Sequence, residues 1–231
     1  NHSSTRSTTH TPTDPSAFWT RYRALTHRKL EIGYHFEADQ RRMSCFKSLS
    51  YRSQAIKTQF KKTPIFVLGM PRSGTTLVER ILTGSSGVES GGELNSLNLA
   101  VAGSLSKHGL PHLSPGYINK IGDINYDQLR QAYFNSAEPL IAENCEYFID
   151  KMPLNFMYIE LIANAFPESK IVLLHRNPLD LCIGNFKVLF STQYSLYNYA
   201  LDINNTASYI SAFTDLMKYY KSKLKHRVHI V

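Results

Sequence analysis

Short runs of apolar residues, each closed by glycine or polar residues, occur at four places along the chain. The clearest covers residues 65–68, which follow Thr63-Pro64 and end at Gly69. A continuous apolar run of this length is typical of a strand buried on both faces of a parallel sheet. Comparable runs lie at 147–149, 171–174 and 228–231. The pattern therefore predicts four buried strands, and a further strand is expected just before Gly91-Gly92.

Longer stretches with apolar residues three or four positions apart separate these runs. They predict helices over 75–82, about 155–166, about 178–190 and about 204–224. Strands alternating with helices indicate an α/β fold, with a P-loop-like parallel sheet flanked by helices on both faces and right-handed crossovers. In such sheets ligands bind at the carboxyl ends of the strands.

The remaining segments set the expected domain organisation. Residues 1–15 are rich in Ser, Thr and Pro and predict a disordered lead-in, whereas 16–62 predict a helical extension of two or three amphipathic helices. Residues 107–124 contain Gly, Pro, His and Asn and predict a long irregular loop, either functional or a mere insertion. Residues 63–231 form the expected main domain, which we expect to be truncated because its last run ends like an unfinished strand.

The charge balance favours anionic ligands without choosing among them. The 231 residues include 26 Lys and Arg against 18 Asp and Glu, a formal charge of +8. Many basic residues are spread through the first 62 positions, which favours a solvated helix face over a nucleic-acid stripe. We expect no nucleic-acid partner, while the N-terminal helices could bind another protein.

The cysteine, histidine and hydropathy patterns predict no disulfide bond, no metal site and no membrane-spanning segment in this sequence. Three cysteines at long separations indicate reduced thiols, and the scattered histidines give no metal site. The apolar runs fall far short of the ~20 residues that span a bilayer. A soluble, cytoplasmic protein is favoured, although the compartment is left open.

The most informative segment is 65–77, IFVLGMPRSGTTL, where a predicted strand, a glycine turn and a predicted helix follow one another. Gly69 and Gly74 permit conformations and close approaches that a Cβ prevents. The backbone amides of 73–76 can point at an anion on the helix N-terminus, where the dipole favours negative charge. The residues of the predicted anion-binding loop are Pro71, Arg72, Ser73, Gly74, Thr75 and Thr76.

This loop resembles a Walker A sequence except at one position. Thr75 stands where Walker A has the lysine that reaches the β and γ phosphates of a nucleoside triphosphate. The substitution disfavours ATP or GTP hydrolysis, and Arg72 supplies the cationic charge instead. The alternative is a strand-to-helix turn that binds nothing.

Several motifs resemble the sulfotransferases that use 3′-phosphoadenosine 5′-phosphosulfate. PRSGTT at 71–76 resembles their 5′-phosphosulfate loop, in the arginine version of the tyrosylprotein sulfotransferases. GGELNSL at 91–97, DKMPLNF at 150–156 and FPESKIVLLHRNPLDLC at 166–182 resemble, in order, segments of bacterial-type sulfotransferases that carry tetratricopeptide repeats. The resemblance covers about 60–231, and the helical stretch before it resembles the end of a repeat region.

The resemblance implies roles for individual residues. Glu93 aligns with the catalytic glutamate and would be the base, the alternative being a cap of the following helix. Lys151 and Arg72 would stabilise charge on the bridging and leaving oxygens, although Lys151 could instead pair with Asp150 or face solvent. Arg176 would bind the 3′-phosphate of the nucleotide.

One position departs from the family pattern. The family has a serine eight residues after the arginine of the 3′-phosphate site, where this chain has Gly184. Gly184 could offer its backbone amide, Asn185 or Ser191 could substitute, or donor affinity could be weaker by one or two powers of ten.

Two other functions stay open on the sequence. A P-loop kinase would use Asp150 as a magnesium-binding acid, and a noncatalytic module would bind a nucleotide without transfer. For a sulfotransferase, the acceptor hydroxyl could belong to a peptide tyrosine, a carbohydrate or a small alcohol.

Overall fold

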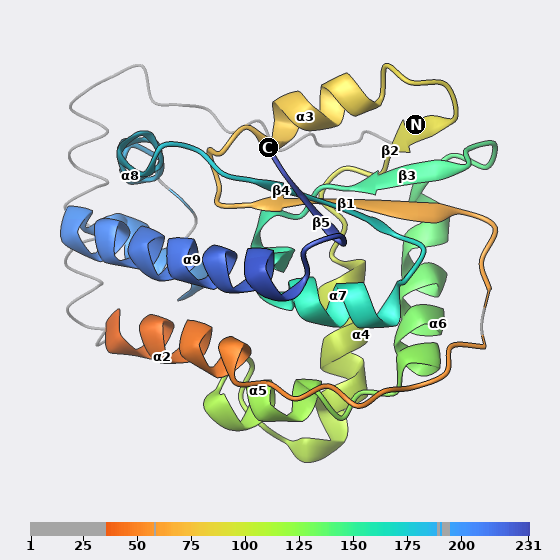
Figure 1. The fold of residues 1–231 in the computed structure, drawn as a ribbon, viewed down its shortest axis with the longest axis horizontal. Helices are drawn as coiled ribbons and strands as arrows, with labels where there is room; N and C mark the ends of the chain where they lie inside the picture. Colours follow the sequence, from red (N-terminus) through yellow and green to blue (C-terminus); the bar gives the residue numbers. More distant parts are fainter. Residues whose placement is uncertain (1–35, 58, 189, 191–194) are drawn as a thin grey trace, which may run out of the picture.

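A five-stranded parallel sheet forms the centre of the computed structural model (Figure 1), which describes residues 36–57, 59–188, 190 and 195–231. The strand order is β2-β3-β1-β4-β5, and every neighbouring pair is parallel. The strands are β1 (Thr63–Gly69), β2 (Val88–Ser90), β3 (Tyr147–Asp150), β4 (Lys170–Leu174) and β5 (Val228–Ile230). The α/β fold class with a parallel sheet is therefore confirmed.

Helices cover both faces of this sheet (Figure 1). The α-helices are α2 (Phe36–Lys47), α3 (Thr75–Leu82), α4 (Ser96–Leu105), α5 (Pro115–Ile121), α6 (Tyr126–Ala137), α7 (Ile159–Ala165), α8 (Pro178–Phe186) and α9 (Ile203–Lys223). The 3-10 helices are η1 (Ser106–His108), η2 (Glu138–Leu140), η3 (Pro153–Tyr158) and η4 (Ser195–Leu201). None of the described helices is both long enough and apolar enough to cross a membrane.

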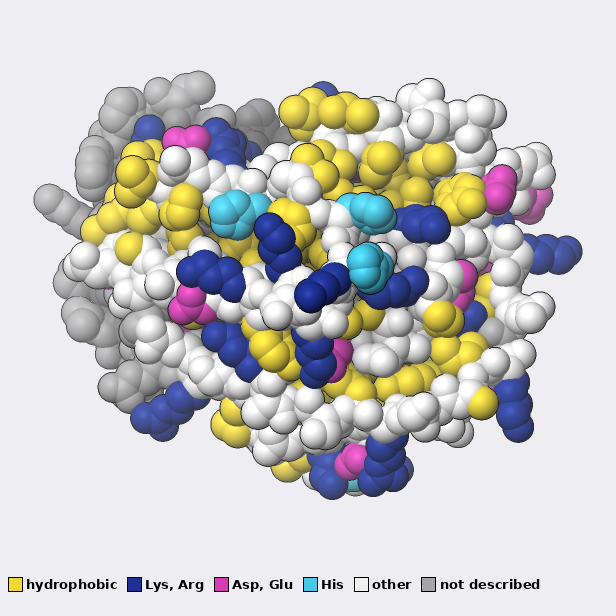
Figure 2. Space-filling model, viewed as in Figure 1, with side chains coloured by type: hydrophobic (Ala, Val, Ile, Leu, Met, Phe, Trp, Pro, Cys, Tyr) yellow, Lys and Arg dark blue, Asp and Glu magenta, His cyan; other side chains and the backbone are white. Residues whose placement is uncertain are grey.

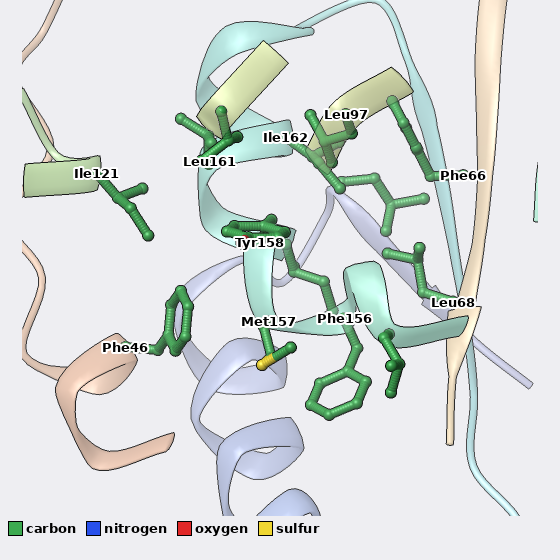
Figure 3. Packing of buried hydrophobic residues seen from close by; sticks show 14 of the residues in the cluster. Phe46, Phe66, Leu68, Leu97, Ile121, Phe156, Met157, Tyr158, Leu161 and Ile162 are labelled. Carbon is green, nitrogen blue, oxygen red and sulfur yellow. The ribbon is translucent and has the colours of Figure 1, made fainter. Parts of the chain in front are cut away.

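Side chains along β1 point alternately to the two faces of the sheet, and each face packs against its own layer of helices. Ile65 and Val67 point to the α3 side, where they pack in a small cluster with Val78 of α3. Phe66 and Leu68 point to the opposite side, into the main core beneath α4, α6 and α7. Figure 3 shows Phe66 and Leu68 facing Leu97 and Ile162, which come from α4 and α7. Burial on both faces is why the run reads as continuously apolar.

The predicted strands and three of the predicted helices form close to the expected positions. The stretch predicted as a helix over 155–166 begins as η3 and becomes α-helical only in α7. Helix α6 was not predicted, and α4 was expected only as the helix that follows Glu93. The predicted irregular loop over 107–124 is wrong in part, because it contains η1 and α5. Ser114 caps α5 by accepting a hydrogen bond from the Tyr117 amide, and Pro115 occupies its first turn.

The described part of the N-terminal extension packs on the main domain. Helix α2 lies against α9 and α5, and Met43 and Phe46 are buried in the main core. Residues 48–57 and 59–62 contain no helix; in this stretch Gln54 donates to the Ile124 carbonyl and accepts from the Tyr126 amide. The predicted lead-in 1–15 and the first predicted helix lie outside the described residues.

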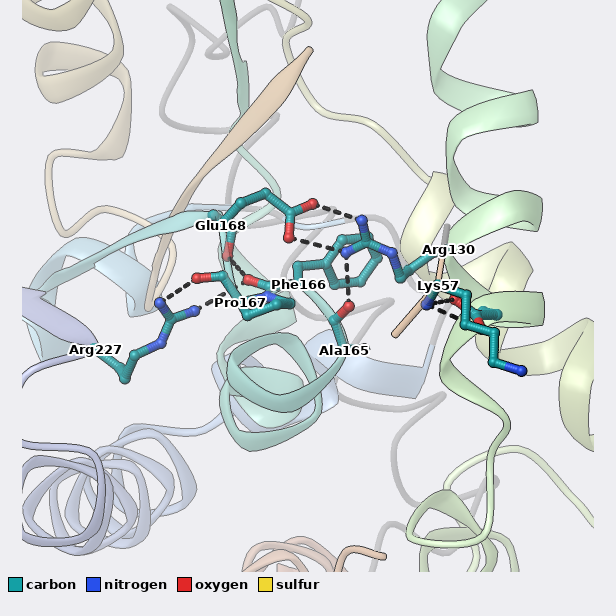
Figure 4. A network of polar contacts seen from close by, with 9 residues as sticks. Lys57, Arg130, Ala165, Phe166, Pro167, Glu168 and Arg227 are labelled. Carbon is teal, nitrogen blue, oxygen red and sulfur yellow. Dashed lines mark hydrogen bonds and ion pairs between the residues drawn. The ribbon is translucent and has the colours of Figure 1, made fainter. Parts of the chain in front are cut away.

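Polar contacts fix the turn between α7 and β4 (Figure 4). Arg130 of α6 forms an ion pair with Glu168 at 2.8 Å and donates to the Ala165 carbonyl at 2.8 Å. From the other side, Arg227 donates to the carbonyls of Phe166 and Pro167. These contacts fix the backbone just before β4. The other end of the same strand leads into the candidate site.

Candidate active site

The loop after β1 has the backbone shape of an anion cradle. Gly69 has φ 149° and Gly74 has φ 108°, both in the region that favours glycine. A Cβ on Gly69 would lie 2.9 Å from Ser73 Oγ and 3.0 Å from the Leu174 carbonyl oxygen. The close approach of the loop to β4 therefore requires glycine at position 69. Arg72, between the two glycines, also adopts a positive φ of 67°.

Several hydrogen-bond donors of this loop have no acceptor among the described residues. Gly74 caps α3, and within the described residues no acceptor takes the backbone amides of Gly74, Thr75 or Thr76. Ser73 is 9% exposed, and its hydroxyl is buried without a hydrogen-bond partner. Buried donors without partners are costly, so this arrangement is expected where a ligand supplies the acceptor. The cradle suits a phosphate or sulfate group on the N-terminus of α3.

Arg176 joins the end of β4 to this loop. Its Nη1 donates to the Arg72 carbonyl at 3.3 Å, and its Nε contacts Asp180 of α8 at 3.4 Å. The side chain is half exposed, so the guanidinium retains donors for an anion from solvent. The structure thus brings Arg176 into contact with the predicted anion-binding loop.

Gly184 of α8 faces the same loop. A Cβ at this position would lie 3.3 Å from the Arg72 Cβ, so a serine here would press on the loop arginine. The neighbouring Asn185 is fully buried; it donates to the Pro71 carbonyl at 2.8 Å and accepts from the Tyr199 hydroxyl at 2.8 Å. Asn185 is committed to holding the loop, and Ser191 lies outside the described residues.

A second group of charges lies where β3 ends. Lys151 Nζ is 2.6 Å from Glu93 Oε1 and 3.8 Å from Glu79 Oε2. Lys151 is 8% exposed, whereas the side chain of Glu93 is 58% exposed. Glu93 therefore presents a carboxylate to solvent beside a largely buried cation. Among the described residues, no hydrogen bond or ion pair joins Arg72 to either Glu93 or Lys151.

The structure shows neither an ion pair between Lys151 and Asp150 nor a capping role for Glu93 at the following helix. The ion-pair partners of Lys151 are Glu93 and Glu79 rather than Asp150. Helix α4 begins at Ser96 with Asn95 as its cap, so Glu93 lies ahead of the helix and outside its first turn. The Lys151 amide donates to the Gly92 carbonyl at 2.9 Å, which holds the two segments together.

Sequence reasoning missed two residues that support this pair. Ser90 of β2 donates to Glu79 of α3 at 2.5 Å and accepts from the Gly92 amide at 3.0 Å. This chain of contacts ties α3 to the backbone just before Glu93. Glu79 and Ser90 carry no recognisable motif, and only the fold brings them together.

Asp150 is enclosed in the opposite layer of the molecule. It is 0% exposed and accepts a hydrogen bond from the Tyr133 hydroxyl of α6 at 3.0 Å. Burial raises the pKa of Asp150 to about 7. A carboxyl group packed beneath the sheet against α6 is poorly placed to hold a hydrated magnesium ion at the loop, which argues against the kinase alternative. No cluster of three His, Cys, Asp or Glu suited to a metal occurs in the described ranges.

A cavity of about 660 Å³ is lined by sequence neighbours of Glu93 and Lys151, while neither of these two residues is among its described lining. Its wall includes Asn95 and Met152, which lie two residues after Glu93 and directly after Lys151. The wall also includes Tyr197, whose pKa is raised by burial and by the Glu93 carboxylate. The cavity therefore lies near Glu93 without being lined by it.

The comparisons with known proteins agree with this geometry. Residues 64–231 match the family model described as the sulfotransferase family. The chain is also 36% identical over 146 residues to an uncharacterized protein of Aquifex aeolicus (strain VF5), a match that covers 62% of this chain and 19% of that protein. The chain therefore spans about a fifth of the length of the relative that it matches.

Proposed function

Because the chain belongs to the sulfotransferase family, we propose that it transfers a sulfuryl group from 3′-phosphoadenosine 5′-phosphosulfate to the hydroxyl of an acceptor. The observation that carries the proposal is the cradle after β1, where three backbone amides and the buried Ser73 hydroxyl lack acceptors. A sulfated phosphate would supply those acceptors. Thr75 in place of the Walker lysine favours this donor over a nucleoside triphosphate.

The two ends of the donor would be held by different elements. The 5′-phosphosulfate would sit on the loop 71–76 at the N-terminus of α3. Arg176, whose guanidinium already donates to the loop backbone, would bind the 3′-phosphate. Gly184 would contribute only its backbone to that phosphate, because a side chain there would meet Arg72.

Glu93 and Lys151 would carry out the chemistry of transfer. The acceptor oxygen would attack sulfur, a new S–O bond would form, and the S–O bond to the donor phosphate would break with its electron pair on the phosphate. The acceptor proton would pass to the Glu93 carboxylate. Lys151, 2.6 Å from Glu93, and Arg72 would stabilise the negative charge that grows on the bridging oxygen.

Calorimetric titration with 3′-phosphoadenosine 5′-phosphate tests the donor assignment. We expect this nucleotide to bind and to raise the melting temperature, and Mg²⁺-ATP to bind at least tenfold more weakly. Arg176→Ala should weaken binding by one to two powers of ten, because a charged hydrogen bond is worth about 1.5–3 kcal/mol. Lys187→Ala, an exposed change just beyond α8, is the matched control. Equal weak heats for both nucleotides would refute the assignment.

A noncatalytic nucleotide-binding module is the second candidate, and Gly184 is the observation that favours it, since the family has a serine there. This candidate shares the expected donor binding but not the transfer. Glu93→Gln separates the two, because it should abolish transfer of labelled sulfate while leaving nucleotide affinity unchanged. Nucleotide binding with no transfer by the unaltered chain to any acceptor would favour the module.

A further inference from the structure

The cavity beside Glu93 and Lys151 has a lining that favours one class of molecule. Most of its wall is aliphatic, with Leu99, Leu113, Leu154, Met157 and Leu196 among the contributors. Its volume of about 660 Å³ falls in the range of small-molecule sites. Burial of apolar surface is therefore the main source of affinity that this cavity offers.

Charge is missing from the described part of this wall. None of the described lining residues is Lys, Arg, Asp or Glu. His112 is the one titratable base there, and burial and the nearby Arg42 lower its pKa, which favours the neutral ring. Arg42 itself is engaged, since it pairs with Asp39 and donates to the Leu113 carbonyl. Among the described lining residues an anionic ligand would find no cation to pair with, and its desolvation would be costly.

Polar groups are confined to a few places on the wall. Asn95 and Asn98 lie on the α4 side, and Asn98 donates to Asn155 at 3.2 Å. Tyr197, whose pKa is raised by burial and by the Glu93 carboxylate, lies elsewhere on the wall. Its ring is stacked on Phe190 with centroids 4.7 Å apart. A ligand with one hydroxyl at the Glu93 end and an apolar body along the leucines matches this distribution.

We propose that the cavity is the acceptor site and that it takes an uncharged alcohol or phenol with an apolar body, rather than an acidic peptide or a carbohydrate. The inference rests on the proposed function, because it makes Glu93 the base for the acceptor hydroxyl. The acceptor oxygen gains the sulfuryl group, its proton goes to Glu93, and the donor leaves as the nucleotide phosphate.

A matched pair of phenols tests the proposal by direct calorimetric binding, with and without 3′-phosphoadenosine 5′-phosphate. Methyl 4-hydroxyphenylacetate and 4-hydroxyphenylacetate share the phenol and differ in charge. We expect the neutral ester to bind at least tenfold more tightly than the anion, and more tightly than lactose or an acidic tyrosine peptide. Transfer of labelled sulfate should follow the same order in kcat/KM.

A second test introduces a positive charge into the wall of the cavity. Leu99 is 56% exposed on α4, so Leu99→Lys should leave the fold intact while reversing the preference toward the anion. Leu140→Lys is the matched control, since Leu140 is 62% exposed in η2 and does not line the cavity. The control should keep the preference of the unaltered chain.

The outcomes separate this inference from the proposed function. Ester binding without nucleotide binding would refute the donor assignment and leave the cavity proposal standing. Nucleotide binding accompanied by equal or tighter binding of the anion, the peptide or lactose would overturn the cavity proposal alone. An unchanged preference in Leu99→Lys would also overturn it.

Discussion

At the scale of single residues, the candidate site combines groups that sequence identifies with groups that only the fold explains. The loop glycines followed from the pattern of strand, turn and helix, whereas the roles of Arg176 and Lys151 were implied by the family resemblance. Asn185 was considered only as a phosphate ligand, yet its amide is bound to the Pro71 carbonyl, 114 positions away. A partner so distant in sequence leaves no local signal at either residue.

Asp150 gives a residue-scale prediction about pH. The pKa of Asp150 is raised from 3.8 to about 7 by burial, so the folded chain holds one proton more than the unfolded chain between these values. Its contribution to the free energy of unfolding is present below pH 4 and is lost as the pH rises to 7, by up to about 1.4 kcal/mol per pH unit. Asp150→Asn should remove this slope, as measured by urea unfolding at pH 4.5, 5.5 and 6.5.

The control for this experiment is Asp215→Asn, because Asp215 is exposed on α9. It should keep the slope of the unaltered chain. A slope that persists in Asp150→Asn would show that other groups set the pH dependence.

At the scale of elements, the hydrophobic pattern predicted the alternation of strands and helices along the chain. It did not reveal all of the helices. The α4 sequence, SLNLAVAGSL, is apolar on most sides and shows little amphipathic periodicity, since even its exposed positions include Leu99 and Ala102. The sequence of α5 did carry a local signal, Ser114 before Pro115, which the prediction of an irregular loop overlooked. Among the helices that hydrophobic periodicity did not reveal, α5 and α6 each carry a capping residue that was overlooked, whereas α4 lacks the amphipathic pattern by which a surface helix is recognised.

The short edge strand β2 gives an element-scale prediction. Ser90 ties β2 to Glu79 of α3 and to the Gly92 amide, so it positions the backbone that carries Glu93. Ser90→Ala should lower kcat about tenfold, because a small misplacement of a reacting group is costly, and should leave nucleotide affinity unchanged. Single-turnover transfer and calorimetry measure the two quantities.

Ser86→Ala, in the exposed turn before β2, is the control and should alter neither quantity. An unchanged kcat in Ser90→Ala would remove Ser90 from the support of Glu93. A weakened nucleotide affinity would instead show that β2 acts on the loop through α3.

At the scale of the whole molecule, charge and packing separate into different regions. Figure 2 shows Lys, Arg and His side chains gathered over the middle of one face, where β5 and the end of α9 lie. Exposed lysines at the end of α9 and in the turn that follows it include Lys221 and Lys225. The net charge of +8 noted in the sequence is thus partly concentrated at this edge of the sheet, where it adds long-range attraction for an anionic nucleotide.

Packing at this scale decides whether α2 is an appendage or part of the domain. Phe46 is 0% exposed and meets the Tyr158 ring edge-on at 5.8 Å, deep in the core that also contains Phe66 of β1 (Figure 3). Phe46→Ala should therefore lower the free energy of unfolding of the whole chain by about 3–5 kcal/mol in a single transition, measured by urea denaturation. Ser44→Ala, exposed on the same helix, should change it by less than about 0.5 kcal/mol. If α2 were an independent appendage, Phe46→Ala would leave the main transition in place, since the sheet and its helices would lose no buried contact.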